Sequence, residues 1–177
     1  NAKTSNIAYI FQGDSTMPWL TVAQNVAFGL NIKHTPPKQR DELVDKYLDI
    51  VGLTKFRNYY PKQLSSSMLQ RVSIARAFAT EPELLLMDEP YGQLDIELRF
   101  KLEDELVKLW EMTGTTVIFI THNIEEAVYL GQRIMILTNK PTTVKETVDN
   151  NMPRPRDIAA PEFIDLRNRV TERIKWW

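Results

Sequence analysis

Residues 84–90 read LLLMDEP, an unbroken apolar run that ends in two acids and a proline. A continuous apolar run of this length is typical of a strand in a parallel sheet, buried on both faces. Such a strand places Asp88 and Glu89 at the carboxyl edge of the sheet, where open α/β sheets bind ligands. There one acid can hold Mg²⁺ and the other can deprotonate a water molecule. The alternative is that both acids only cap the strand and solvate a turn.

A second apolar run, residues 116–120, is followed by Thr121 and His122. Neighbouring parallel strands present their carboxyl ends at the same edge, so we expect His122 to lie near Glu89. A histidine in that place can hydrogen-bond a phosphate or orient the base and its water. A lone histidine is more often an ordinary core or surface residue, and the convergence of two strand ends favours the functional interpretation.

Helices alternate with these strands along the chain. An apolar stripe predicts a helix over 97–112, and a short helix over 124–130 precedes a third predicted strand over 133–137. This alternation predicts right-handed crossovers and a parallel sheet that includes 133–137. Residues 7–12 predict a further short buried strand.

A polar loop, LSSSMLQR at 64–71, opens a helix predicted over Met68–Thr80. Helix N-termini offer free N–H groups and the positive end of the helix dipole, so this loop is a candidate anion site. A plain serine N-cap explains the stretch equally well when it is taken alone. Between the first strand and this loop, the sequence predicts a helix capped by Thr21 and a second amphipathic helix. Gln12, at the end of the first strand, does not by itself indicate a function.

Composition narrows the class of protein. The 177 residues correspond to one domain or part of one. Lys and Arg number 22 against 23 Asp and Glu, so no basic excess points to nucleic acid as a partner. There is no cysteine, which excludes disulfides and thiolate metal or redox sites. The apolar runs are far shorter than the roughly 20 residues of a transmembrane helix.

Together and in this order, the motifs resemble those of the ATP-binding subunit of ABC transporters. Residues 11–12 resemble the Q-loop, residues 64–78 the signature motif with its helix, and residues 84–90 the Walker B strand with its catalytic glutamate. Residues 92–95 are similar to the D-loop and residues 120–122 to the H-loop.

Three further stretches are most similar to the nitrate/sulfonate/taurine importer subfamily: MPWLTV at 17–22, THNIEEAVYLGQRIMIL at 121–137 and PRPRD at 153–157. The resemblance implies an α/β fold with a P-loop NTPase-like (RecA-like) parallel sheet core and an inserted α-helical subdomain. It also implies ATP and Mg²⁺ as cofactors, and import of a small anion as the process that ATP hydrolysis drives.

The resemblance assigns roles to the site residues. Asp88 would hold Mg²⁺, Glu89 would act as general base, and His122 would contact the γ-phosphate. Gln12 would link Mg²⁺ and the attacking water to the membrane subunits. The signature loop would close over ATP bound to a second ATPase subunit in a head-to-tail dimer. The residues implied on that side of the nucleotide are Ser65, Ser66, Ser67, Met68 and Asp95.

The same resemblance divides the chain into four parts. Residues 1–13 would hold the end of a core strand and the Q-loop, and residues 14–80 the helical subdomain with the signature motif. Residues 81–149 would form the RecA-like core with Walker B, D-loop and H-loop, and residues 150–177 a carboxy-terminal tail.

The implied partners are transmembrane permease subunits and, indirectly, an extracytoplasmic solute-binding protein. The chain would then lie peripherally on the cytoplasmic face of the membrane. Met17, Pro18, Trp19 and Phe28 are candidates for the permease contact, and Phe28 reads equally as core of the helical subdomain.

Two departures from the family pattern matter. None of the six glycines precedes a lysine, so we expect the first strands and the Walker A loop to precede Asn1. Ser66 and Ser67 stand where the family has glycines, and their side chains either crowd the phosphate or donate compensating hydrogen bonds. The leading interpretation is an importer ATPase that is inactive without its Walker A region. The alternative is a non-catalytic truncated subunit that binds a complete ATPase or a permease.

Overall fold

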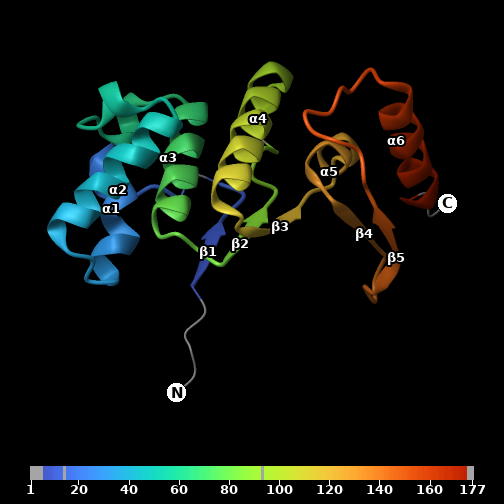
Figure 1. Cartoon of the computed structure of the whole chain (residues 1–177), viewed down its shortest axis with the longest axis horizontal. Coiled ribbons are helices and arrows are strands. Elements are labelled where there is room, and N and C mark those ends of the chain that lie inside the picture. The colour runs from blue at the N-terminus through green and yellow to red at the C-terminus, as the bar shows by residue number, and fades with distance from the viewer. Residues whose placement is uncertain (1–5, 14, 93, 175–177) are drawn as a thin grey trace. The chain divides into compact units, whose positions relative to one another are not determined.

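The structure, a computed structural model, describes residues 6–13, 15–92 and 94–174. The chain divides into two compact units, Asn1–Ile120 and Thr121–Trp177. Each unit has its own β-sheet (Figure 1). Within the described residues, no helix combines the length and the apolar character needed to cross a lipid bilayer.

A parallel sheet with the strand order β1-β2-β3 forms the base of the first unit. The strands are β1 (Ile7–Ile10), β2 (Leu84–Asp88) and β3 (Thr116–Ile120). Helix α4 (Ile96–Thr113) connects β2 to β3 and ends at Gly114, whose φ of 64° a glycine adopts without steric cost. The predicted α/β class with a parallel sheet is therefore confirmed.

Burial along the sheet differs from the expectation that its strands are buried on both faces. Leu85 and Met87 are fully buried, whereas alternate residues of β2 are only half-buried. On the outer strands, several apolar side chains are 40–52% exposed: Ile7, Tyr9, Ile118 and Ile120. The unbroken apolar run is present, but within the first unit the described residues cover only one face of the sheet.

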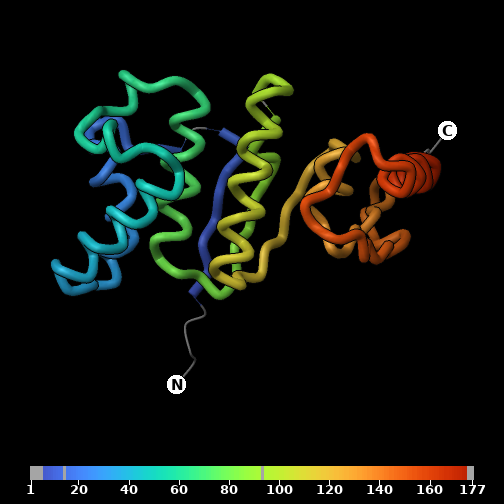
Figure 2. Tube along the Cα trace, turned by 45° about the horizontal axis from the view of Figure 1, so that its top comes forward, coloured from blue at the N-terminus to red at the C-terminus, as the bar shows by residue number. Residues whose placement is uncertain are grey.

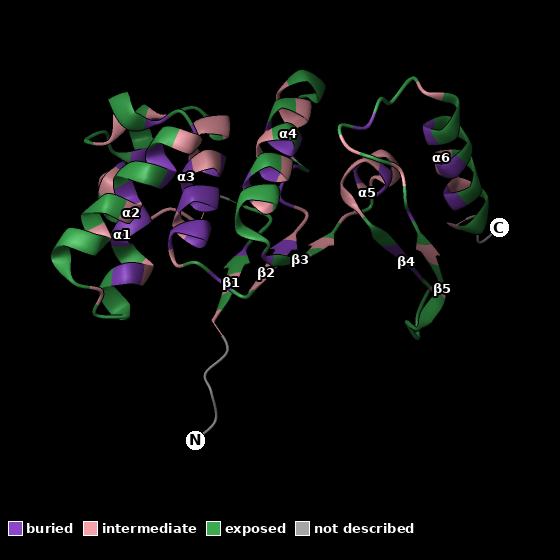
Figure 3. Cartoon of the chain, viewed as in Figure 1, coloured by how far each residue is buried: buried purple, intermediate pink, exposed green. Residues whose placement is uncertain are grey.

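Between β1 and β2 the sequence forms three helices: α1 (Val22–Ile32), α2 (Pro37–Ile50) and α3 (Ser66–Ala79). These helices pack against one another. They lie side by side (Figure 2), and their buried residues gather where they face one another (Figure 3). Thr21 caps α1 as predicted, because its N–H donates to the Gln24 side chain while its hydroxyl accepts from the Gln24 N–H. Two short 3₁₀ turns, Thr54–Phe56 and Pro61–Gln63, connect α2 to α3. The core of this bundle includes Val22, Val26, Leu30, Val44, Tyr47, Leu48 and Phe78.

In the second unit, α5 (Ile124–Leu130) and α6 (Pro161–Ile174) accompany a two-stranded sheet of β4 (Arg133–Leu137) and β5 (Val144–Asp149). The prediction that 133–137 forms a strand is confirmed, and its place in the parallel sheet stays a prediction. β4 pairs antiparallel with β5, a strand that the sequence analysis missed. The reason is that β5 has only two apolar residues, Val144 and Val148, and of these only Val148 packs against the apolar cluster that includes residues of α6.

The PRPRD stretch at 153–157 has a structural role in this unit. The Arg156 guanidinium donates to the carbonyls of Val128 at 2.9 Å and Tyr129 at 2.7 Å. These carbonyls lie in the last turn of α5, which lacks intrahelical donors, and a cation there also stabilises the helix dipole. Burial and the neighbouring Arg154 lower the pKa of Arg156 to about 10, so that it stays charged at neutral pH.

Candidate functional site

Asp88 and Glu89 lie at the carboxyl end of β2, as predicted. The N–H of Glu89 donates to the carbonyl of Ile120 at 2.9 Å, which extends the pairing of β2 with β3 by one step. Glu89 then turns the chain with a φ of 43°, in the left-handed region that a side chain disfavours. Backbone strain of this kind concentrates at functional sites, which favours a functional interpretation of this turn over simple strand capping.

Gln12 lies against Glu89 although 77 positions separate them in the sequence. Its Nε2 donates to Oε2 of Glu89 at 3.0 Å. The contact follows from the topology, because β1 and β2 are parallel neighbours and both residues leave the same edge. From its own strand Gln12 gave almost no signal, and this contact is what distinguishes it from an ordinary loop glutamine.

Tyr9 is a site residue that the sequence analysis missed. Its hydroxyl donates to Oδ2 of Asp88 at 3.2 Å, from the exposed face of β1. Burial and the Asp88 carboxylate raise the pKa of Tyr9, so that its hydroxyl keeps its proton. The period-two alternation of β1 contained the signal, because Tyr9 points to the same face as the alternate residues of β2.

Asp95, in the predicted D-loop, is the N-cap of α4. Its Oδ1 accepts from the N–H of Leu98 at 2.9 Å, the geometry of a helix N-cap. This capping bond explains the aspartate structurally, and a role beside nucleotide stays a prediction. Gln93 of the same motif lies outside the described residues.

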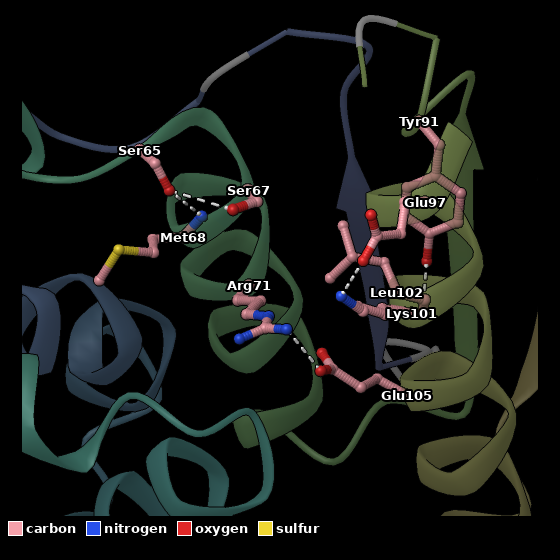
Figure 4. A network of polar contacts seen from close by, with 9 residues as sticks. All are labelled: Ser65, Ser67, Met68, Arg71, Tyr91, Glu97, Lys101, Leu102 and Glu105. Carbon is pink, nitrogen blue, oxygen red and sulfur yellow. Dashed lines mark hydrogen bonds and ion pairs between the residues drawn. The ribbon is translucent and has the colours of Figure 1, made fainter. Parts of the chain in front are cut away.

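Ser65 caps α3 at the predicted signature motif, and Ser66 and Ser67 form the first turn of the helix. The Ser65 hydroxyl accepts from the N–H of Met68 at 3.4 Å and lies 3.0 Å from the Ser67 hydroxyl (Figure 4). The Ser67 side chain is thus folded back onto the N-cap, and Ser66 is exposed. The plain N-cap is present, so an anion site at this helix end stays a prediction.

An ion pair joins the signature helix to α4. Nη2 of Arg71 lies 2.7 Å from Oε1 of Glu105, and each side chain is 23% exposed (Figure 4). Burial raises the pKa of Glu105, and the Arg71 charge opposes that shift. Because Asp95 is the N-cap of α4, this pair connects the helix of the signature motif with the helix that follows the D-loop motif.

His122 belongs to the second unit and is exposed. The neighbouring Thr121 hydroxyl donates to Oε2 of Glu126 at 2.5 Å and accepts from the N–H of Asn123 at 2.9 Å. Asn123 in turn caps α5. These bonds give the stretch after β3 a defined conformation, and the expected proximity of His122 to Glu89 stays a prediction.

The described residues contain no cluster of three or more histidine, aspartate or glutamate side chains of the kind that cages a metal ion. The pair predicted for Mg²⁺, Asp88 and Gln12, nevertheless supplies a carboxylate and an amide, both oxygen donors. Mg²⁺ usually takes one or two protein ligands and completes its shell with water and substrate phosphates. The chemistry of this donor set therefore fits Mg²⁺.

A parallel sheet with two acids at its carboxyl edge, a glutamine on the adjacent strand and an inserted helical bundle is consistent with an ABC-type ATP-binding domain. A family model described as ABC transporter matches residues 1–92. The chain belongs to this family.

The chain is 45% identical over 166 residues to an uncharacterized ABC transporter ATP-binding protein of Methanocaldococcus jannaschii, covering 94% of this chain and 62% of that protein. It is 46% identical over 168 residues to a putative ATP-binding protein of Brucella abortus, covering 93% and 65%. It is 41% identical over 167 residues to the aliphatic sulfonates import ATP-binding protein SsuB of Bacillus cereus, covering 94% and 65%. The chain thus spans somewhat less than two thirds of the length of these relatives.

Proposed function

We propose that this chain is part of an ATPase subunit that energises import of a small anion, and that it supplies the residues at the sheet edge that catalyse ATP hydrolysis. The observation that carries the proposal is the contact of Gln12 with Glu89 on the strained turn after β2. A glutamate that is both half-buried and oriented by an amide donor suits a general base better than it suits a strand cap.

In the proposed reaction a water oxygen attacks the γ-phosphorus of ATP, the water proton passes to the Glu89 carboxylate, and ADP leaves. Gln12 holds the Glu89 carboxylate in one orientation through its amide N–H. Tyr9 donates to one oxygen of Asp88, which restrains the carboxylate proposed to face the metal. Bound Mg²⁺ would neutralise the charge that develops on the phosphates.

The class of solute is proposed from the relatives. Several relatives at 40–41% identity are named aliphatic sulfonates import ATP-binding proteins, which supports a sulfonate or a similar small anion such as nitrate or taurine. We also propose that the chain forms a homodimer or heterodimer with a second ATPase subunit. This dimer would work with a permease and an extracytoplasmic binding protein.

A groove on the helical bundle supports the permease contact. It is an open groove of about 460 Å³ beside the loop that follows Gln12. Trp19, 72% exposed, is the most exposed aromatic residue on its rim, and Phe28 is 38% exposed. An apolar groove with an exposed tryptophan suits an amphipathic helix of a membrane partner. The lining residues are Trp19, Leu20, Gln24, Phe28, Asn31 and Ile32.

A second candidate function is a non-catalytic subunit that only binds a permease or a complete ATPase. The observation in its favour is the pair Ser66 and Ser67, with the Ser67 hydroxyl turned onto Ser65 rather than outward. On this alternative the groove beside Trp19 binds the partner protein, and the turn at Glu89 has no role in catalysis.

We expect the 177-residue chain alone neither to bind ATP tightly nor to hydrolyse it, because its sequence has no Gly-Lys pair of the kind with which a Walker A loop holds the phosphates. A chimera in which the Walker A segment of a related ATPase precedes the chain, called the Walker A chimera below, is expected to hydrolyse ATP with Mg²⁺. Calorimetric titration with ATP and a phosphate-release assay check both. Saturable micromolar binding by the chain alone contradicts the first expectation. A chimera that binds ATP and a permease but releases no phosphate favours the non-catalytic candidate.

Substituting both signature serines by glycine, S66G/S67G, is expected to raise the kcat of the Walker A chimera by about twofold to fivefold. Glycine lets backbone N–H groups approach a phosphate, whereas Ser67 now commits its side chain to the N-cap. The phosphate-release assay at saturating ATP measures the effect. S73G, inside the same helix, is the control for loss of helix propensity. If S66G/S67G does not raise kcat, the serines do not weaken the closed dimer.

A further inference from the structure

Arg76 joins the signature helix to the segment that follows Gln12. Its Nη1 donates to the carbonyl of Ser15 at 2.8 Å, and its Nη2 donates to the Ser15 hydroxyl at 2.6 Å. The two residues are 61 positions apart, and the contact is partly buried. A guanidinium offers paired donors in a rigid fork, so both bonds hold Ser15 in one place on α3.

A second anchor holds the same loop to α1. The Asn25 side chain, fully buried, accepts from the N–H of Met17 at 2.8 Å and donates to the carbonyls of Met17 and Leu20 at 3.2 and 3.1 Å. The N–H of Leu20 closes the turn by donating to the Met17 carbonyl. The loop from Ser15 to Leu20 is therefore tied to the helical bundle at both of its ends.

Gln12 lies only three residues before this anchored loop. Three residues span at most about 10 Å, so a displacement of Ser15 cannot be absorbed over a long tether. On its other side Gln12 contacts Glu89 at the edge of the sheet. Gln12 and Ser15, three positions apart, are thus held by a bond on the sheet and a bond on α3, respectively.

We propose that Arg76 is a positioning residue for Gln12. By clamping Ser15 to α3, it keeps the amide of Gln12 in reach of Glu89 and makes the signature helix and Gln12 move together. Trp19 stands on the anchored turn, so a partner seated in the groove beside it would pull on the same clamp. The effect on catalysis rests on the proposed function, whereas the clamp itself does not.

The test uses the whole chain and the nuclear magnetic resonance signal of the Gln12 side-chain amide. E89A supplies the signal of a Gln12 that has lost its contact. R76Q is expected to move the Gln12 signal toward the E89A position and to speed amide exchange in residues 15–20 about tenfold. R76K, which can satisfy one of the two acceptors on Ser15, is expected to fall between R76Q and the unsubstituted chain. R57Q is the matched control, because Arg57 also belongs to the helical bundle but pairs with Asp45 at the exposed surface.

A Gln12 signal that stays in place in folded R76Q overturns the proposal. Should R76Q fail to fold, S15A removes one of the two acceptors and is expected to shift the signal in the same direction by less; no shift overturns the proposal. In the Walker A chimera, R76Q is expected to lower kcat about tenfold at an unchanged KM for ATP, and an unchanged kcat overturns the positioning role. A chimera without any ATPase activity contradicts the proposed function, and the Gln12 signal then decides on the clamp.

Discussion

E89Q is expected to lower the kcat of ATP hydrolysis in the Walker A chimera by about two to four orders of magnitude. The glutamine side chain has nearly the same size and still offers an oxygen to the amide of Gln12, so the turn after β2 keeps its contact. An amide cannot accept the proton of the attacking water. The loss therefore falls on the chemical step, and the affinity for ATP is expected to change by less than about threefold.

Phosphate release at saturating ATP measures kcat, and titration calorimetry measures the affinity for ATP. E97Q is the matched control, because Glu97 also follows the β2 edge but its side chain is 82% exposed and pairs with Lys101. We expect E97Q to leave kcat within about twofold. An E89Q protein that keeps more than about a tenth of the rate would show that Glu89 does not serve as the general base.

R71M is expected to lower the free energy of unfolding of the chain by about 2 kcal/mol. Breaking a fully buried ion pair costs about 3–5 kcal/mol, since it leaves the partner charge unpaired, and an exposed pair contributes about 1 kcal/mol or less. Both side chains of the Arg71–Glu105 pair are 23% exposed, which places the cost between these limits. The double variant R71M/E105M is expected to regain most of the loss, because two apolar side chains leave no charge to solvate.

The loss also depends on pH with a definite sign. Burial already raises the pKa of Glu105, and Arg71 opposes the shift, so R71M raises this pKa further. A carboxyl whose pKa is higher in the folded than in the unfolded chain costs stability when ionised, and this cost disappears as the pH falls below its unfolded value. The difference between R71M and the unsubstituted chain is thus largest near pH 7 and smaller near pH 4.

Urea unfolding at both pH values, followed by circular dichroism, measures these differences. K101M is the control for removing an exposed charge on α4, where the Glu97–Lys101 pair is worth about 0.5 kcal/mol or less. Equal losses in R71M and K101M would show that the Arg71–Glu105 pair contributes no more than a surface pair.

The local pattern of the sequence was sufficient for most elements of the fold. The apolar run 84–87 and the run 116–120 predicted β2 and β3 within one residue, and Thr21 predicted the start of α1. Helix periodicity, caps and apolar runs depend on neighbours a few positions away, so they can be read along the chain. The same local signals failed at β5, whose alternation is weak.

What lies far apart in the sequence required the tertiary structure. Strand order decided that Gln12 lies on Glu89 and that Tyr9 donates to Asp88, since both contacts depend on β1 pairing with β2 rather than with another strand. Packing of helices decided that Arg76 holds Ser15.

The sequence by itself determined the class of this protein. The evidence for the class is the order of the motifs from Gln12 to His122 and the two acids at the end of an apolar strand. The tertiary structure decided how the site is assembled, and which strand β4 pairs with. The physical reason is that periodicity and end signals come from local sterics and hydrogen bonding. Contacts between distant side chains arise only when burial of apolar surface has brought their elements together.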